Sequence, residues 1–120
     1  MVVKQKKYLP DRGDIIQISF TPQSGREQAG FRPALVVSPI AYNRLSHFIL
    51  ACPITSRIKG WAFEVILPST LTTYGVVLAD QISTLDWRSR GGKFIEKSPD
   101  EVVSEVLAKI LPLLSIEESS

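Results

Sequence analysis

Residues 27–39 read EQAGFRPALVVSP, a polar loop that runs directly into an apolar strand. Because a proline ring disfavours the helical region for the residue before it, Pro33 should hold Arg32 in extended backbone at the mouth of this strand. A planar guanidinium with several donors, fixed in such a place, has the geometry needed to grip a phosphate. Taken alone, however, an arginine at a loop-to-strand junction is more often a solvated surface residue.

A second short apolar run, residues 48–53, also ends in a polar and basic segment. That segment, residues 54–60, reads ITSRIKG and carries two hydroxyl groups and two cations just past the end of the predicted strand. Hydroxyls in loops usually bond to nearby backbone. Spacing alone therefore favours a structural role for Thr55 and Ser56 over a catalytic one.

Length and composition predict one small globular domain that covers residues 1–120. No apolar run approaches the roughly 20 residues that a membrane span needs, and no signal-peptide pattern follows the basic N-terminus. We therefore expect a cytoplasmic protein with no membrane partner. The net charge of +2 is too small to indicate nucleic-acid binding, so any RNA contact must be a local basic patch. Cys52, the single cysteine, lies in an apolar run and is expected in the core.

Apolar alternation predicts strands over most of the chain. Residues 14–20 place Ile16, Ile18 and Phe20 on one face and polar residues on the other, which is the signature of a half-buried strand. Glycine and proline separate the runs, and many short strands with turn signals between them predict a small barrel. The other predicted strands are residues 34–37, 48–52, 62–67, 75–79 and 82–85.

The C-terminal part of the chain has helical periodicity instead. Ser98 and Glu101 resemble an N-cap and its capping-box partner, with Pro99 in the first turn between them. Pro112 cannot donate to a helix interior and should end or kink the helix there. An apolar stripe should pack this helix on the barrel. The stripe comprises Val102, Val103, Val106, Leu107, Ile110 and Leu114.

Taken in order, these pieces resemble the MazF/PemK (also called Kid) family of toxin endoribonucleases from bacterial toxin–antitoxin pairs. Each piece is short, but their order and spacing together are a specific signal that spans nearly the whole chain. The matching positions are Tyr8, Pro10, Gly13, Asp14, residues 20–22, Gly25, residues 27–39, Asn43, Pro53, Thr55, residues 59–60, residues 63–64, residues 75–81, Trp87 and Arg88.

The resemblance implies a mainly β fold with α, an SH3-like small β-barrel with a C-terminal helix, as in the plasmid toxins CcdB and MazF. It also implies a homodimer whose RNA groove lies along the subunit interface. The implied activity is sequence-specific cleavage of single-stranded messenger RNA, which inhibits translation, with no cofactor. The implied protein partner is a cognate MazE-like antitoxin with an acidic tail.

The sequence itself suggests how such cleavage would proceed. It contains one histidine, His47, no metal-ligand spacing of His, Cys and Asp, and no glycine-rich phosphate loop. We therefore expect a metal-independent reaction in which the ribose 2′-hydroxyl attacks the adjacent phosphorus and leaves a 2′,3′-cyclic phosphate and a 5′-hydroxyl. The enzyme would align the attack and stabilise the charge that develops on the phosphate oxygens.

Three residues match catalytic positions of the family motifs. Arg32 would stabilise the charged transition state, and Thr55 would add a hydroxyl donor. Glu27 is either a general base, an orienter of the guanidinium, or simply an ion-pair partner of Arg32, and the sequence leaves these roles open. A further set is expected to bind RNA through phosphate contacts or base edges. This set comprises Gln28, Asn43, Ser56, Arg57, Lys59, Asp80, Gln81, Arg88 and Lys93.

Two other functions remain possible on the same barrel. A CcdB-like toxin would bind DNA gyrase without cleaving nucleic acid, but that action relies on a C-terminal Trp-Gly-Ile, whereas residues 116–120 here read IEESS. A catalytically inactive RNA-binding module would share every feature described above. Only an activity assay separates that module from a nuclease.

Overall fold

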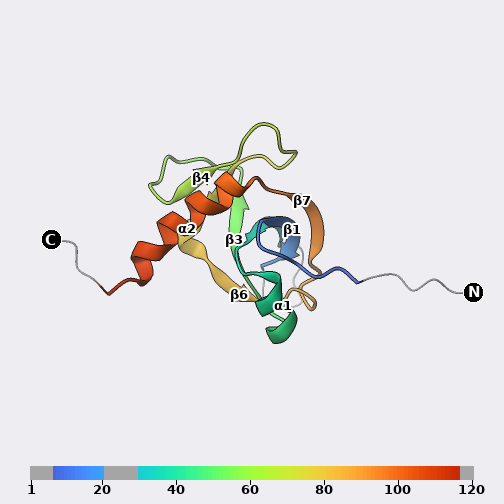
Figure 1. The fold of residues 1–120 in the computed structure, drawn as a ribbon. Coiled ribbons are helices and arrows are strands. Elements are labelled where there is room, and N and C mark those ends of the chain that lie inside the picture. Colours follow the sequence, from blue (N-terminus) through green and yellow to red (C-terminus); the bar gives the residue numbers. More distant parts are fainter. Residues whose placement is uncertain (1–6, 21–29, 117–120) are drawn as a thin grey trace, which may run out of the picture.

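The computed structural model describes residues 7–20 and 30–116, which form a strongly bent antiparallel sheet with a long helix laid across it (Figure 1). A short helix and a 3-10 turn lie in connections between strands. In chain order the elements are β1 (Asp14–Ser19), β2 (Phe31–Val36), α1 (Ile40–Ser46), β3 (Ile49–Thr55), β4 (Glu64–Ile66), β5 (Val76–Leu78), η1 (Ala79–Gln81), β6 (Ser83–Leu85), β7 (Lys93–Lys97) and α2 (Asp100–Leu114).

The sheet is built around β3, the most central strand. Its strands follow the order β4-β5-β3-β2-β1-β7, and every pairing is antiparallel. One edge of β3 pairs with β2, and the other pairs first with β6 and then with β5. The 3-10 turn η1 joins β5 to β6, so the chain changes course there while it stays beside β3. This bend turns the sheet back on itself.

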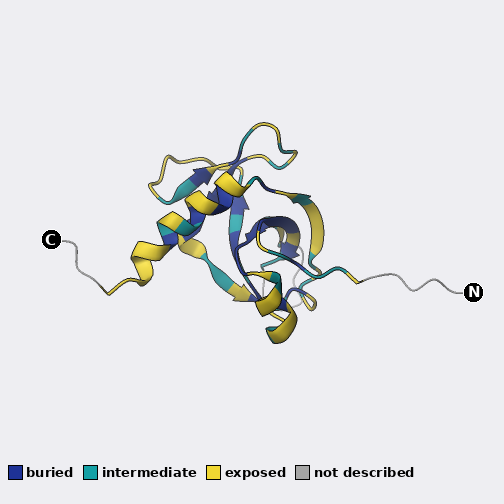
Figure 2. Ribbon diagram, in the orientation of Figure 1, coloured by how far each residue is buried: buried dark blue, intermediate teal, exposed yellow. Residues whose placement is uncertain are grey.

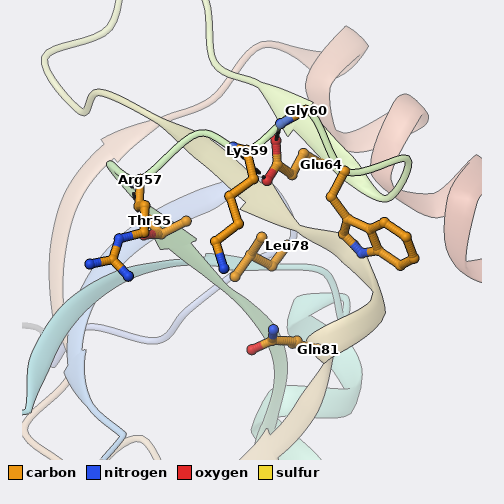
Figure 3. Close-up of a pocket in the computed structure, with 8 residues that line it drawn as sticks. Thr55, Arg57, Lys59, Gly60, Glu64, Leu78 and Gln81 are labelled. Carbon is orange, nitrogen blue, oxygen red and sulfur yellow. Dashed lines mark hydrogen bonds between the residues drawn. The ribbon is translucent and has the colours of Figure 1, made fainter.

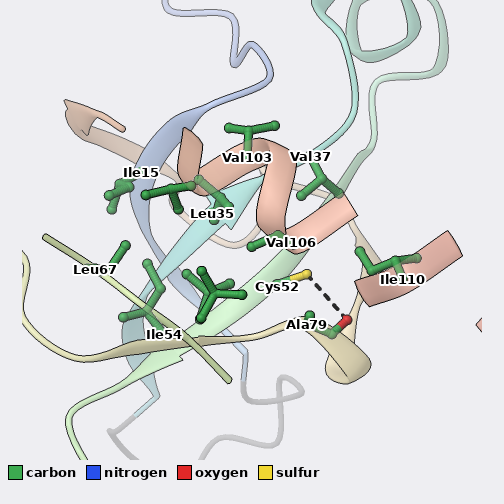
Figure 4. Packing of buried hydrophobic residues seen from close by; sticks show 13 residues of the cluster. Ile15, Leu35, Val37, Cys52, Ile54, Leu67, Ala79, Val103, Val106 and Ile110 are labelled. Carbon is green, nitrogen blue, oxygen red and sulfur yellow. Dashed lines mark hydrogen bonds between the residues drawn. The ribbon is translucent and has the colours of Figure 1, made fainter. Parts of the chain in front are cut away.

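Each face of the sheet buries its own apolar cluster, as the alternation of side chains requires. On one face Ile15, Leu35 and Cys52 pack under α2, whose buried residues include Val103 and Val106 (Figure 4). On the other face Ile16, Ile18 and Ala34 pack with Leu85 and Trp87. Figure 2 shows that much of β1 and β3 is buried, while β7 and the outer surface of α2 are exposed. This two-sided burial fixes the register of β1, β2 and β3, because a slip of one residue would exchange the two clusters.

A carboxylate joins the last strand to the loop between β4 and β5. Both carboxylate oxygens of Glu96 on β7 accept hydrogen bonds, from the backbone N–H and the hydroxyl of Thr72 and from the same groups of Thr73, at 2.7–3.1 Å. Burial alone would raise the pKa of Glu96, but these hydrogen bonds outweigh it and lower the pKa to about 2. The bonds link the two ends of the sheet, where no ladder pairing is present among the described residues.

The fold class expected from the sequence is confirmed, and so are most of the strands. Two elements were not predicted: α1, which has only seven residues, and β7, whose residues are mostly exposed. Cys52 is buried as expected, and burial, with a smaller effect from Asp80, raises the pKa of its thiol to about 12. No helix in the described part of the chain is long and apolar enough to cross a membrane.

The predicted N-cap of the C-terminal helix and the expected packing of Leu114 were wrong. Ser98 is not its N-cap: the Ser98 hydroxyl donates to the carbonyl of Gly13 at 2.9 Å, and α2 begins at Asp100. The helix also continues past Pro112, and Leu114 at its end is exposed instead of packed on the sheet. The Ser98 hydroxyl is used in a tertiary hydrogen bond, and Leu114 lies one turn beyond Ile110, the last buried residue of α2.

Candidate functional site

Arg32 and Thr55 lie across from each other on neighbouring strands. In the β2–β3 ladder Ala34 is paired with Pro53 and Leu35 with Cys52. Continuing this register outward by two residues places Arg32 opposite Thr55, with both side chains on the same face. Both residues also line an open pocket of about 350 Å³, together with Ser56 and Tyr74. Arg32 and Thr55, which are 23 positions apart in the sequence, therefore lie together in one pocket where β2 begins and β3 ends.

A larger pocket of about 690 Å³ adjoins the first, and Thr55 lines both of them. The side chain of Lys59 extends into this space between Thr55 and Leu78, and Gln81 approaches from η1 (Figure 3). Arg57, Trp61 and Glu64 complete most of its wall. The two pockets together form a continuous surface from Arg32, past Thr55, to the loop before β4.

Local hydrogen bonds give that loop a defined shape. The two carboxylate oxygens of Glu64 accept the backbone N–H groups of Lys59, at 3.1 Å, and Gly60, at 2.9 Å (Figure 3). Gly60 has a φ of 78°, a left-handed conformation that side chains disfavour. Because Glu64 is engaged with backbone, the ammonium of Lys59 is left pointing into the pocket.

The hydroxyl of Thr55 has a structural contact and a free donor. Its oxygen accepts the backbone N–H of Arg57 at 3.1 Å, which is the turn chemistry that the sequence favoured. A hydroxyl group also carries one proton to donate, so accepting this bond leaves Thr55 able to donate to a phosphate oxygen. The structural and the functional interpretations of Thr55 are compatible.

The surface around these two pockets is cationic. Arg32, Arg57 and Lys59 are exposed, and none of them has a carboxylate within 4.0 Å among the described residues. Among the described residues, both ion pairs are formed by Lys97, one with Asp11 and one with Asp14. Exposed cations favour polyanionic ligands, and the described residues offer such a local basic patch despite the small net charge.

The structure places Asn43, which was predicted to bind RNA, in the interior. Asn43 is fully buried. Its amide donates to the carbonyls of Pro10, at 2.8 Å, and Ser38, at 3.1 Å, and its oxygen accepts the Ser38 hydroxyl at 2.5 Å. The side chain ties α1 to the segment before β1. The sequence alone could not distinguish this buried, hydrogen-bonded amide from an amide on the surface.

Asp80 and Gln81 form, with Ala79, the 3-10 turn η1 between two strands. Gln81 is exposed and lines the larger pocket. Asp80 is also exposed, but its Oδ2 accepts the indole N–H of Trp61 at 3.1 Å. Gln81 is thus free to contact a ligand, whereas the Asp80 carboxylate already has a partner.

Arg88 and Lys93 line neither pocket. The Arg88 guanidinium lies 5.2 Å from the centre of the Trp87 ring, in a cation–π contact. Trp87 is only 6% exposed and belongs to the core. The loop between β6 and β7, which carries Arg88, nevertheless lies beside β2, the strand that carries Arg32. A Cβ added at Gly91 in this loop would stand 3.3 Å from the ring of Phe31 on β2.

The described residues do not include every member of the predicted site. Glu27 and Gln28 lie outside the described residues. Within the described ranges, no group of three or more His, Cys, Asp or Glu side chains could hold a metal ion. Sequence reasoning missed Trp61 and Tyr74 as pocket residues. The signal for Trp61 was an exposed aromatic directly after a basic loop, a combination common in nucleic-acid sites.

Comparisons with known proteins agree with this architecture. A family model described as PemK-like, MazF-like toxin of type II toxin–antitoxin systems matches residues 11–114. The endoribonuclease toxin MazF of Escherichia coli K12 is 43% identical over 108 residues, which cover 90% of this chain and 96% of that protein. The endoribonuclease PemK of Escherichia coli is 38% identical over 110 residues, 88% of this chain and 82% of PemK.

A solved structure shares the whole fold. The crystal structure of MazE-MazF (Form-II) from Deinococcus radiodurans aligns with a TM-score of 0.86 and 50% identity, and the alignment covers 92% of this chain and 100% of the other. A crystal structure of MazF (Form-I) from the same organism aligns with a TM-score of 0.83 and 51% identity, over 90% and 98% of the two chains.

Proposed function

The chain belongs to the PemK-like, MazF-like toxins of type II toxin–antitoxin systems, and from this membership we propose a metal-independent cleavage of single-stranded messenger RNA. Its relatives at about 40% identity over most of the chain are endoribonucleases, and it is an endoribonuclease toxin of this family. The observation that supports the chemistry is the placement of Arg32 opposite Thr55 in one cationic pocket.

In the proposed reaction the 2′-oxygen of the RNA attacks the neighbouring phosphorus, and the bond from phosphorus to the 5′-oxygen breaks. The products are a 2′,3′-cyclic phosphate and a 5′-hydroxyl. Arg32 stabilises the charge on the non-bridging oxygens, and Thr55 donates its hydroxyl to one of them. Arginine stays protonated in proteins, so Arg32 is not the general base.

The proton balance requires two further groups. One must accept the proton of the 2′-hydroxyl, and one must protonate the departing 5′-oxygen. Glu27 is our candidate for the first role or for orienting Arg32. Base selection is assigned to residues that line the two pockets together with Thr55, namely Gln81, Ser56, Arg57 and Lys59. Arg88 and Lys93 would then contact the RNA farther along the strand.

The experiment is cleavage of a long RNA, followed by mapping of the new 5′ ends and synthesis of an oligonucleotide around the preferred site. One 2′-deoxy substitution at the scissile nucleotide should abolish cleavage of that oligonucleotide, and excess EDTA should not. Products should carry 5′-hydroxyl ends. Cleavage of the 2′-deoxy substrate, or loss of activity in EDTA, would contradict the mechanism.

We also propose that the toxin works as a cytoplasmic homodimer and is neutralised by a MazE-like antitoxin. Solved MazF relatives include complexes with MazE. A flexible acidic segment would be drawn to the same exposed cations, Arg32, Arg57 and Lys59, that would attract RNA. Sedimentation at micromolar concentration should give about twice 13.3 kDa. Antitoxin binding should weaken as salt rises and should block cleavage; tight binding that leaves cleavage intact would contradict a shared surface.

The alternative of a gyrase-binding toxin of the CcdB type has no support in these findings, since the relatives described above are endoribonucleases. An inactive RNA-binding module would fail the cleavage experiment outright.

A further inference from the structure

Trp61 is an exposed aromatic residue that is nevertheless held in place. The residue is 52% exposed and lies in the loop before β4. The indole N–H donates to Oδ2 of Asp80 at 3.1 Å, and the ring lies 5.4 Å from the ring of Phe63 at an interplanar angle of 47°. The loop that carries it is itself anchored, because Glu64 binds the backbone of Lys59 and Gly60.

A ring that is half exposed to water contributes little to the burial of apolar surface in the core. Single exposed apolar residues are common on protein surfaces and usually need no explanation. Trp61 differs because a charged acceptor and a neighbouring ring fix its orientation, and because it lines the larger pocket beside Arg57 and Lys59. A flat ring next to cations is the arrangement with which proteins bind single-stranded nucleic acid, where bases stack and phosphates pair.

The larger pocket adjoins the proposed cleavage site, and this position indicates which ligand the Trp61 ring would contact. Thr55 lines both pockets, so a phosphate held by Arg32 and Thr55 places the adjoining nucleotide at the larger pocket. Beside the larger pocket, Oδ2 of the Asp80 carboxylate is engaged with the indole N–H of Trp61. The acidic residue thus serves the pocket by orienting an aromatic ring.

We propose that Trp61 is the stacking platform for an RNA base next to the cleaved phosphate, and that Asp80 is a positioning residue that holds Trp61 instead of contacting a base. This inference rests on the proposed ribonuclease function. It assigns to Asp80 a role different from the base contact expected from the sequence. It also names a residue, Trp61, that the sequence-based set did not contain.

The first test measures binding without turnover. The probe is a short single-stranded RNA that contains the mapped cleavage site with one 2′-deoxy nucleotide at the scissile position. Stacking on the exposed Trp61 should change the tryptophan fluorescence of the wild-type protein, whereas the buried Trp87 should contribute little to that change. Trp61→Ala should raise the dissociation constant roughly 5- to 150-fold, the range expected for one stacked base.

Conservative variants separate the ring from its hydrogen bond. Trp61→Phe keeps an aromatic face but has no N–H, so it should bind RNA better than Trp61→Ala and worse than wild type. Asp80→Asn keeps an oxygen that can accept the indole N–H and should bind nearly as wild type, with an unchanged cleavage motif. Asp80→Ala should weaken binding to about the level of Trp61→Phe.

The decisive comparison is a double-mutant cycle. If Asp80 acts through Trp61, then Asp80→Ala should have no further effect in the Trp61→Phe background, because the bond it would remove is already gone. If Asp80 reads a base directly, the two losses should add, and Asp80→Asn should shift the preferred cleavage sequence. Either of these last two results would overturn the assignment.

A matched control and two readouts keep the outcomes distinct. Tyr42→Ala removes an exposed ring on α1, outside both pockets, and should leave RNA binding unchanged. If wild-type protein does not cleave RNA, the proposed function has failed. If it cleaves and Trp61→Ala binds and cleaves equally well, only this inference has failed. A Trp61→Ala variant that loses an acidic antitoxin peptide but retains RNA would likewise overturn it.

Discussion

Gly75 lies so close to Thr55 that a methyl group on Gly75 would stand 2.1 Å from the carbonyl oxygen of Thr55. Gly75 also has a φ of 128°, which side chains rarely adopt. The residue just before β5 therefore allows β3 and β5 to approach at the point where Thr55 enters both pockets. The position of a proposed catalytic hydroxyl therefore depends on the absence of a side chain at the residue that leads into the neighbouring strand.

Gly75→Ala should therefore destabilise the protein and displace Thr55. Backbone strain alone should cost about 1–3 kcal/mol, and relief of the clash must move the backbone of Thr55 as well. Thermal unfolding measures the first effect, and cleavage at a temperature where the variant is folded measures the second. Gly60→Ala is the matched comparison, since Gly60 has a φ of 78° but nothing within 4 Å of an added Cβ. Equal losses of stability in the two variants would show that the contact with Thr55 is unimportant.

Arg32→Ala and Thr55→Val should each lower cleavage by roughly 100- to 1000-fold, as expected when one preorganised donor to the transition state is lost. The unfolding midpoint of Arg32→Ala should stay nearly unchanged, because Arg32 is exposed and has no carboxylate partner among the described residues. Single-turnover cleavage and calorimetry are the measurements. Thr55→Ser, which keeps the hydroxyl, and Arg44→Ala, at an exposed arginine of α1, are the controls. Full activity in both test variants would refute the assignment.

Asn43→Ala should destabilise the fold by about 2 kcal/mol or more, because it leaves the buried carbonyls of Pro10 and Ser38 without their amide donor. Asn43→Asp should also destabilise it at neutral pH, since an ionised carboxylate accepts but does not donate. Urea denaturation gives the free energy of unfolding. At a temperature where the variants are folded, their RNA affinity should match wild type. A stable variant with weakened RNA binding would return Asn43 to the binding surface.

Glu96 should make stability sensitive to acid. Its pKa is lowered from 4.5 to about 2 in the folded protein, so its contribution is fully present above pH 4.5 and is lost as the pH falls from 4.5 toward 2. Glu96→Gln should flatten this part of the curve of unfolding free energy against pH. Glu105→Gln, at an exposed carboxylate on α2, should leave the curve close to that of wild type. Parallel curves for wild type and Glu96→Gln would contradict the linkage.

Local patterns in the sequence were sufficient for most of the fold. The alternation of Ile16 and Ile18, the apolar runs around Leu35 and Cys52, and the helical spacing of Val102, Val106 and Ile110 reflect periodicities that a strand or helix imposes on any half-buried segment. The order of short motifs identified the family, which the comparisons confirmed. The prolines and glycines between the runs marked where strands end.

Only the tertiary structure showed which polar residues face the pockets and which are used inside. Asn43 and Gln81 are both amides in connecting segments, yet one is buried among three hydrogen bonds and the other lines a pocket. Trp87 and Trp61 divide in the same way between core and surface. Such assignments depend on contacts between residues far apart in the chain, such as Asn43 with Pro10 and Trp61 with Asp80. A local sequence pattern fixes the element that a residue belongs to, but the partner of its side chain is chosen by how the elements pack.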